Sequence, residues 1–136
     1  MVLASAIAEL PGLTLLPRDE AIRLIAATGV EPGHDDGWEG ISPFVTPSVL
    51  WSLYAFLRSP TDYWEAICTA IAVGGDVDTT AAMTGAIAGA AVGLEGLPPE
   101  IARQVHDRGQ WGYEELQVLA QDLHALRMAR PSQVSG

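Results

Sequence analysis

The feature that most limits how this chain can fold is an uncharged run of small residues, TTAAMTGAIAGAAVGL, at positions 79–94. Glycine inside a helix costs roughly 0.5–1 kcal/mol relative to alanine, so Gly85 and Gly89 indicate that a neighbouring backbone approaches closely. A helix that is apolar on every side belongs in the middle of a bundle. We therefore predict a central buried helix, too short and too rich in glycine and alanine to span a bilayer.

The rest of the pattern is helical as well. The segment RDEAIRLIAAT after Pro17 places apolar residues on one stripe, and Gly29 supplies a left-handed stop. Further helix starts are predicted at Thr46-Pro47, after Ser59-Pro60-Thr61-Asp62, at Asp78-Thr79, at Pro98-Pro99 and just after Gly112. No stretch alternates apolar and polar residues over the length of a strand. The prediction is an all-α protein, a compact orthogonal bundle of about six or seven helices that forms a single domain over residues 1–136.

Charge limits the partners of the chain. It has 7 Lys and Arg against 17 Asp and Glu, a formal net charge of −10. Nucleic acid and anionic membranes require basic patches, so direct binding to either is not expected, although a divalent cation could bridge the protein to an anionic ligand. The single cysteine, Cys68, is predicted to be a buried structural thiol. The N-terminal residues lack the basic segment of a signal peptide, so we expect a cytoplasmic protein.

Two aspartates one residue apart stand at the start of the small-residue helix, in the sequence GGDVDTT. On spacing alone, helix capping is favoured, with Asp78 as the N-cap and Asp76 stabilised by the helix dipole. The alternative is a metal site, because two carboxylates and the hydroxyl of Thr79 offer the oxygen ligands that Mg²⁺ or Ca²⁺ prefers. A calcium EF-hand loop is excluded, since Ala81 and Ile87 stand where its invariant glycine and its glutamate belong.

The longer motif GGDVDTTAAMTGAIAGAAVGLEGLP resembles the C-terminal signature of the ADP-ribosylglycohydrolase family, in which Gly-Gly-Asp-x-Asp-Thr precedes a helix of alanine and glycine. The upstream stretch GISPFVTPSVLWSLYAFLRSPTDYWEAICTAIAVGGD is similar to the loop and the helices that precede this signature in the family. The resemblance extends over about residues 29–126. A bare Asp-x-Asp would not be specific, but the motif together with its Gly/Ala helix is.

The resemblance implies an all-α fold with a binuclear Mg²⁺ centre, whose metals orient the ribose hydroxyls of ADP-ribose and a bridging water. It also implies hydrolysis of the bond that joins ADP-ribose to a modified side chain or to a small conjugate. On the matching positions, Asp76, Asp78 and Thr79 would be metal ligands. Phe44 would border the nucleotide pocket. The resemblance identifies no catalytic residue in this chain.

The chain departs from the family pattern in one respect. Family members carry a second ligand set near their N-terminus, a Thr/Ser-Asp-Asp-Thr element, which does not occur in this sequence. Asp35 and Asp36 are predicted to lie with His34 in a solvated loop, and His106 and His124 on the surfaces of helices. We expect the chain to correspond to the C-terminal half of the fold, with the other half of the metal centre supplied by a separate N-terminal half or by self-association. The alternative is a non-catalytic helical binding or structural domain that kept the fold and lost its site.

Overall fold

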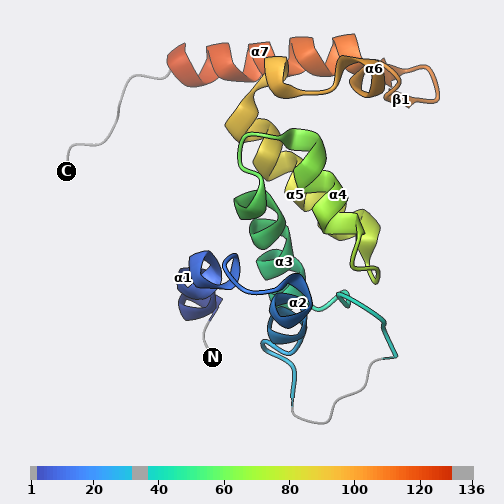
Figure 1. The fold of residues 1–136 in the computed structure, drawn as a ribbon. Helices are drawn as coiled ribbons and strands as arrows, with labels where there is room; N and C mark the ends of the chain where they lie inside the picture. Colours follow the sequence, from blue (N-terminus) through green and yellow to red (C-terminus); the bar gives the residue numbers. More distant parts are fainter. Residues whose placement is uncertain (1–2, 32–36, 130–136) are drawn as a thin grey trace. The chain divides into compact units, whose positions relative to one another are not determined.

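The computed structural model describes residues 3–31 and 37–129. Within these ranges it contains seven α helices, one 3-10 turn and one hairpin of two short strands (Figure 1), so the prediction of an all-α protein is confirmed. The elements in chain order are α1 (Leu3–Leu13), α2 (Arg18–Ala26), α3 (Val45–Arg58), α4 (Tyr63–Ile71), α5 (Val77–Val92), η1 (Leu94–Gly96), α6 (Pro99–Ala102), β1 (His106–Asp107), β2 (Trp111–Gly112) and α7 (Tyr113–Ala129). None of the helices in the described ranges has the length and apolar character needed to cross a membrane.

The chain divides into two compact units, residues 1–97 and residues 98–136. The first unit holds α1 to α5 and the 3-10 turn, and the second holds α6, the hairpin and α7. That the whole chain forms a single domain stays a prediction.

The core of the first unit is built around α3. Its Trp51 and Tyr54 are fully buried, and their rings stack with centroids 4.9 Å apart. The Trp51 indole N–H also donates a hydrogen bond to the Ala70 carbonyl at 3.0 Å, which ties α3 to α4. The buried cluster around these rings consists of Ala6, Leu10, Ala21, Ile25, Ile41, Leu50, Trp51 and Tyr54. Because α3 packs against α1, α2, α4 and α5, it is the helix in the middle of this unit.

The small-residue helix α5 is not the central helix that its sequence predicts. It buries Thr80, Thr84 and Ala88 along one stripe and leaves its other side chains partly or fully exposed. One of its glycines does allow a close approach, since a Cβ on Gly85 would lie 3.0 Å from the Tyr63 hydroxyl of α4. Small side chains allow a helix to be buried on every side, but they do not show that it is. They are needed only on a face that a neighbouring helix approaches closely. In this unit those neighbours are α3 and α4.

The capping signals in the sequence predict the start of α4 correctly and the start of α3 incorrectly. The start of α4 directly after Asp62 is as predicted, and Asp62 is its N-cap, because its Oδ1 accepts a hydrogen bond from a backbone N–H three residues later at 2.9 Å. The start of α3 differs from the prediction, since its N-cap is Phe44 and its first residue is Val45 rather than a residue after Thr46. Pro47 is tolerated inside the first turn because the first N–H groups of a helix have no intrahelical acceptor.

The second unit contains a hairpin where the sequence predicts a continuing helix. The helix that opens at the Pro-Pro pair ends at Ala102, and His106 then pairs with Gly112 across a turn at Arg108-Gly109. Each strand has two residues, too few to show alternation, and an Arg-Gly turn is not one of the usual hairpin signals. His106 therefore lies on a strand, not on a helix. The start of α7 directly after Gly112 is as predicted.

The segment before α3 is joined to the segment before α5 by backbone hydrogen bonds. The Asp76 N–H donates to the Ile41 carbonyl at 2.8 Å, and the Ile41 N–H donates to the Gly74 carbonyl at 3.4 Å. These bonds form a parallel bridge between Ile41 and Gly75. Because each segment leads directly into its helix, α3 and α5 begin at the same end of the unit (Figure 1). We call this contact the 41–75 clip.

Glycine makes the 41–75 clip possible. Gly40 and Gly75 have φ angles of 93° and 84°, which other residues rarely adopt. A Cβ on Gly75 would collide with the Ile41 carbonyl oxygen and lie 2.7 Å from the Ile41 carbonyl carbon. A Cβ on Gly40 would lie 2.5 Å from the Val73 carbonyl oxygen. The two backbones can approach this closely only because neither position carries a side chain.

Replacing Gly75 with alanine tests the clip. The positive φ and the collision with Ile41 both oppose the new Cβ, so we expect the free energy of unfolding to fall by about 2–4 kcal/mol. Gly37→Ala is the control, because Gly37 also has a positive φ, of 72°, but a Cβ there would meet nothing within 4 Å. This variant should lose only about 1 kcal/mol. Urea denaturation followed by circular dichroism measures both, and equal losses would contradict the clip.

A second pair of substitutions tests the core of the first unit. The Tyr54 hydroxyl is buried and lacks a hydrogen-bond partner in the part of the chain that the structure describes. Tyr54→Phe should therefore leave the free energy of unfolding unchanged or raise it. Trp51→Phe removes the bond to the Ala70 carbonyl and leaves a cavity, so it should cost about 2–4 kcal/mol. A larger loss for Tyr54→Phe than for Trp51→Phe in the same denaturation experiment would contradict this description.

Candidate functional site

Asp76 and Asp78 stand at the start of α5, and their positions differ from those that capping favours. The N-cap residue is Asp76, with φ −79° and ψ 66°, and its side chain makes no capping hydrogen bond. Asp78 lies in the first turn, where its Oδ1 accepts a hydrogen bond from the N–H of the next residue, Thr79, at 3.1 Å. The interpretation of Asp78 as the N-cap is therefore wrong, and capping does not account for the two carboxylates.

The two carboxyl groups interact with each other. A side-chain hydrogen bond with Asp76 lowers the pKa of Asp78 below its usual value, the backbone N–H groups of Thr79 and Asp78 lower it further, and burial opposes them. A lowered pKa means that Asp78 is ionised at neutral pH, so its carboxylate can act as an anionic ligand. Asp78 is exposed and Asp76 is half-buried, so a cation can reach the pair from solvent. The arrangement therefore suits a bound cation.

Thr79 adds a third oxygen donor beside the pair. Its side chain is exposed, whereas the side chain of the next residue, Thr80, is fully buried. Oxygen atoms are the ligands that Mg²⁺ accepts, and its octahedral shell takes six of them, several of which are usually water. Across residues 3–31 and 37–129, no group of three or more His, Cys, Asp or Glu side chains is placed to hold a metal ion. The donors thus fit Mg²⁺ in chemical character but supply only part of its shell.

Phe44 lies at the same end of the unit as the two aspartates. It is the N-cap residue of α3 and stands three residues after Ile41, whose backbone bonds to Asp76. Its side chain is 44% exposed, and its carbonyl accepts hydrogen bonds from both the hydroxyl and the N–H of Ser48. The structure therefore places Phe44 near the start of α5, while its position at a nucleotide pocket stays a prediction.

The other residues that the sequence analysis names fall into three groups. Asp35, Asp36 and His34 lie outside the described residues. His106 and His124 are exposed, as predicted for surface residues. The thiol-bearing Cys68, predicted to be buried, is only half-buried on α4.

Two features of the site were not predicted from the sequence. The first is the 41–75 clip, for which the only local signals were the glycines at positions 40 and 75. The second is a set of buried hydroxyls on α3 and α5, which repeat at a spacing of four residues: Ser48, Ser52, Thr80 and Thr84. A serine or threonine repeat of this kind marks one face of a helix but does not reveal which helix faces it.

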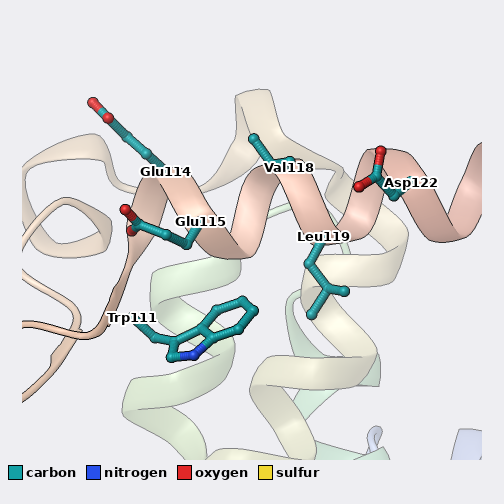
Figure 2. A pocket seen from close by; sticks show the side chains of 6 residues that line it. All are labelled: Trp111, Glu114, Glu115, Val118, Leu119 and Asp122. Carbon is teal, nitrogen blue, oxygen red and sulfur yellow. The ribbon is translucent and has the colours of Figure 1, made fainter.

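A separate groove of about 420 Å³ lies in the second unit, along α7 (Figure 2). Its lining residues are Trp111, Glu114, Glu115, Val118, Leu119 and Asp122. Trp111 and Leu119 lie on one side of the helix, while Glu114 extends toward the other. Glu115 is engaged with the backbone, since its Oε2 accepts a hydrogen bond from the Gly112 N–H at 2.9 Å. The groove is apolar with acidic edges, and none of the predicted site residues lines it.

Comparisons with known proteins show which proteins this chain resembles. The family model for ADP-ribosylglycohydrolase matches residues 2–133. The chain is similar to the ADP-ribosylhydrolase ARH3 of Bos taurus and of Mus musculus, each 39% identical over 95 residues, and to that of Homo sapiens, 37% identical over 95 residues. Each alignment covers 62% of this chain and 24% of the relative, so the matched part is about a quarter of the length of these proteins. No solved structure matches the chain significantly.

The match to the family model is the decisive finding, because it spans nearly the whole chain and includes both segments that the 41–75 clip joins. The all-α fold agrees with what the sequence resemblance implies. The chain therefore belongs to the ADP-ribosylglycohydrolase family.

Proposed function

We propose that this chain is part of an ADP-ribosylglycohydrolase-type hydrolase and that Asp76, Asp78 and Thr79 supply one half of a binuclear Mg²⁺ centre. The observation that carries the proposal is that Asp76, Asp78 and Thr79 lie together at the accessible start of α5. Their carboxylate and hydroxyl oxygens are the donors that Mg²⁺ prefers. The family membership and the names of the relatives support the same reaction class.

The charge of the chain explains why the site would need cations. An ADP-ribose unit carries a pyrophosphate, which a chain with a net charge of −10 repels. Bound Mg²⁺ would supply positive charge for the ligand and polarise oxygen atoms at the reacting centre. The role of the protein residues is to hold the cation in place. Asp76 and Asp78 provide its anionic ligands, while the 41–75 clip fixes the backbone that carries them.

The remaining ligands of the centre would come from outside the described residues. Three donors leave an octahedral shell incomplete, and the relatives are about four times as long as the part that this chain matches. A separate N-terminal half, or a second copy of the chain, would complete the site. The ligand of the complete site would be ADP-ribose on a modified side chain or on a small conjugate.

A non-catalytic helical domain is the competing function. It is favoured by one observation: residues 3–31 and 37–129 contain no group of three metal-binding side chains of the His, Cys, Asp and Glu types. A chain of this kind would keep the packing of α3, α4 and α5 without binding a metal ion. The two functions differ in their response to Mg²⁺.

Calorimetric titration with Mg²⁺, on the full chain alone and mixed with a polypeptide that carries a family Thr/Ser-Asp-Asp-Thr element, tests the proposal. We expect binding that Asp78→Ala or Asp76→Ala weakens by about 100-fold or abolishes, because each removes an anionic ligand. Asp122→Ala is the control, since it removes the same charge from α7. Absence of Mg²⁺ binding in both samples, or equal weakening by Asp122→Ala and Asp78→Ala, would favour the non-catalytic domain.

The same mixture allows a test of the ligand. ADP-ribose should bind in the presence of Mg²⁺, and its affinity should fall at least about 10-fold when EDTA removes the metal, because the cations offset the repulsion between the pyrophosphate and the acidic chain. AMP at the same concentration serves as a control for binding of the adenosine moiety alone. Equal ADP-ribose affinity with and without Mg²⁺ would contradict a metal-mediated site.

A further inference from the structure

Buried hydroxyl groups line the contact between α3 and α5. Ser48 and Ser52 lie four residues apart on α3, and Thr80 and Thr84 lie four residues apart on α5, so each pair occupies one face of its helix. All four side chains are buried. We call this set the hydroxyl ladder. An interface of this kind is unusual, because most buried helix contacts use apolar side chains.

The ladder joins the two helices by hydrogen bonds. The Ser52 hydroxyl contacts the carbonyls of Ser48, at 2.8 Å, and Thr80, at 3.2 Å. The Thr84 hydroxyl donates to the Ser52 carbonyl at 3.4 Å, so bonds cross the interface in both directions. Apolar side chains would allow one helix to slide along the other, whereas directional bonds favour a single alignment. The ladder therefore fixes where the start of α5 lies relative to the start of α3.

At its lower-numbered end the ladder reaches the loop before α3. The Ser48 hydroxyl lies 3.0 Å from the Ser42 carbonyl and 2.8 Å from the Phe44 carbonyl. The second bond runs back one helical turn, as many buried serines do, but the first reaches beyond the helix into the loop. Ser48 thus holds the segment that follows Ile41 and its clip.

The ladder also reaches the acidic turn directly. The fully buried Thr80 donates its hydroxyl to the Asp76 carbonyl at 3.0 Å, with the Val77 carbonyl at 3.4 Å. The Thr80 N–H bonds to the same Asp76 carbonyl at 3.1 Å. The Asp76 N–H is meanwhile held by Ile41 through the clip. Both sides of the Asp76 backbone are therefore anchored, while its side chain makes no capping hydrogen bond.

From these contacts we infer that Thr80 and Ser48 are positioning residues: their hydroxyls hold the Asp76–Asp78 turn and the loop at residues 41–44 in the arrangement that receives the ligand. The ligand part of this inference rests on the proposed metal site. The positioning part concerns the protein without metal and can be measured separately. Loss of a group that orients a metal ligand typically weakens metal binding by 10- to 100-fold, although it never touches the metal.

The main experiment replaces Thr80 with valine, which keeps the shape of the side chain and removes the hydroxyl. In calorimetric Mg²⁺ titration of the full chain, with its complementing polypeptide where binding requires it, Thr80→Val should weaken binding by about 10-fold or more. Thr80→Ser, which retains the hydroxyl, should restore most of the affinity. Thr69→Val is the matched control, because Thr69 is a buried threonine of α4 that is not part of the ladder. Equal affinities of Thr80→Val and Thr69→Val would overturn the inference for metal binding.

Amide hydrogen exchange of the metal-free chain provides the readout that does not depend on Mg²⁺. Thr80→Val should speed exchange of the Asp76 and Ile41 amides by about 10-fold or more relative to Ile25 in α2, and Thr80→Ser should not. Ser48→Ala should act in the same direction and serves as a second variant if Thr80→Val does not fold. Unchanged exchange at Asp76 and Ile41 in the variants would overturn the positioning role. If exchange responds as expected but the unmodified chain binds no Mg²⁺, the positioning role stands and the proposed metal function fails.

Discussion

The backbone pairing between Ile41 and the Gly75-Asp76 peptide determines how the first unit presents its acidic residues. It joins two segments that are far apart in the sequence, and each segment leads directly into a helix. Because α3 and α5 then begin at the same end, the loop with Phe44 and the turn with Asp76 become neighbours. Gly40 and Gly75 make the pairing possible, since a Cβ at either position would meet the backbone of the other segment.

The electrostatics of the acidic turn follow from this geometry. The start of a helix carries partial positive charge, which stabilises a nearby carboxylate by about 0.3–1 kcal/mol in exposed positions. The partial charge of one helix start only partly offsets the charge of two neighbouring carboxylates, and a bound cation would stabilise them further. The buried side of the same turn is polar but uncharged, with hydroxyls and carbonyls satisfying one another along α3 and α5. Charge is thus confined to the solvent side of the turn.

The sequence was sufficient to predict the fold class, because helical periodicity is a local pattern. The Gly-Gly-Asp-x-Asp-Thr motif is local too and identifies the candidate site residues, whose role stays a prediction. It was insufficient where the outcome depends on contacts between distant segments. The clip at Ile41 could not be predicted, because hydrogen bonds between backbones do not require particular residue types, apart from glycine where the backbones approach closely. The central position of α3 could not be separated from that of α5 either, because small residues suit several packing environments. The hairpin at His106 was missed because its strands are too short to show a period.

The proposed function depends on whether the acidic turn of α5 binds a divalent cation. The most direct measurement is a Mg²⁺ titration of the ¹⁵N-labelled full chain followed by amide chemical shifts. A metal site at this turn predicts saturable shifts concentrated at residues 74–80, with smaller shifts at residues 40–44 transmitted through the clip. The acidic edges of the groove along α7 provide an internal comparison within the same spectra. Shifts concentrated at Glu114, Glu115 and Asp122, or equal shifts at every acidic residue of the chain, would contradict it.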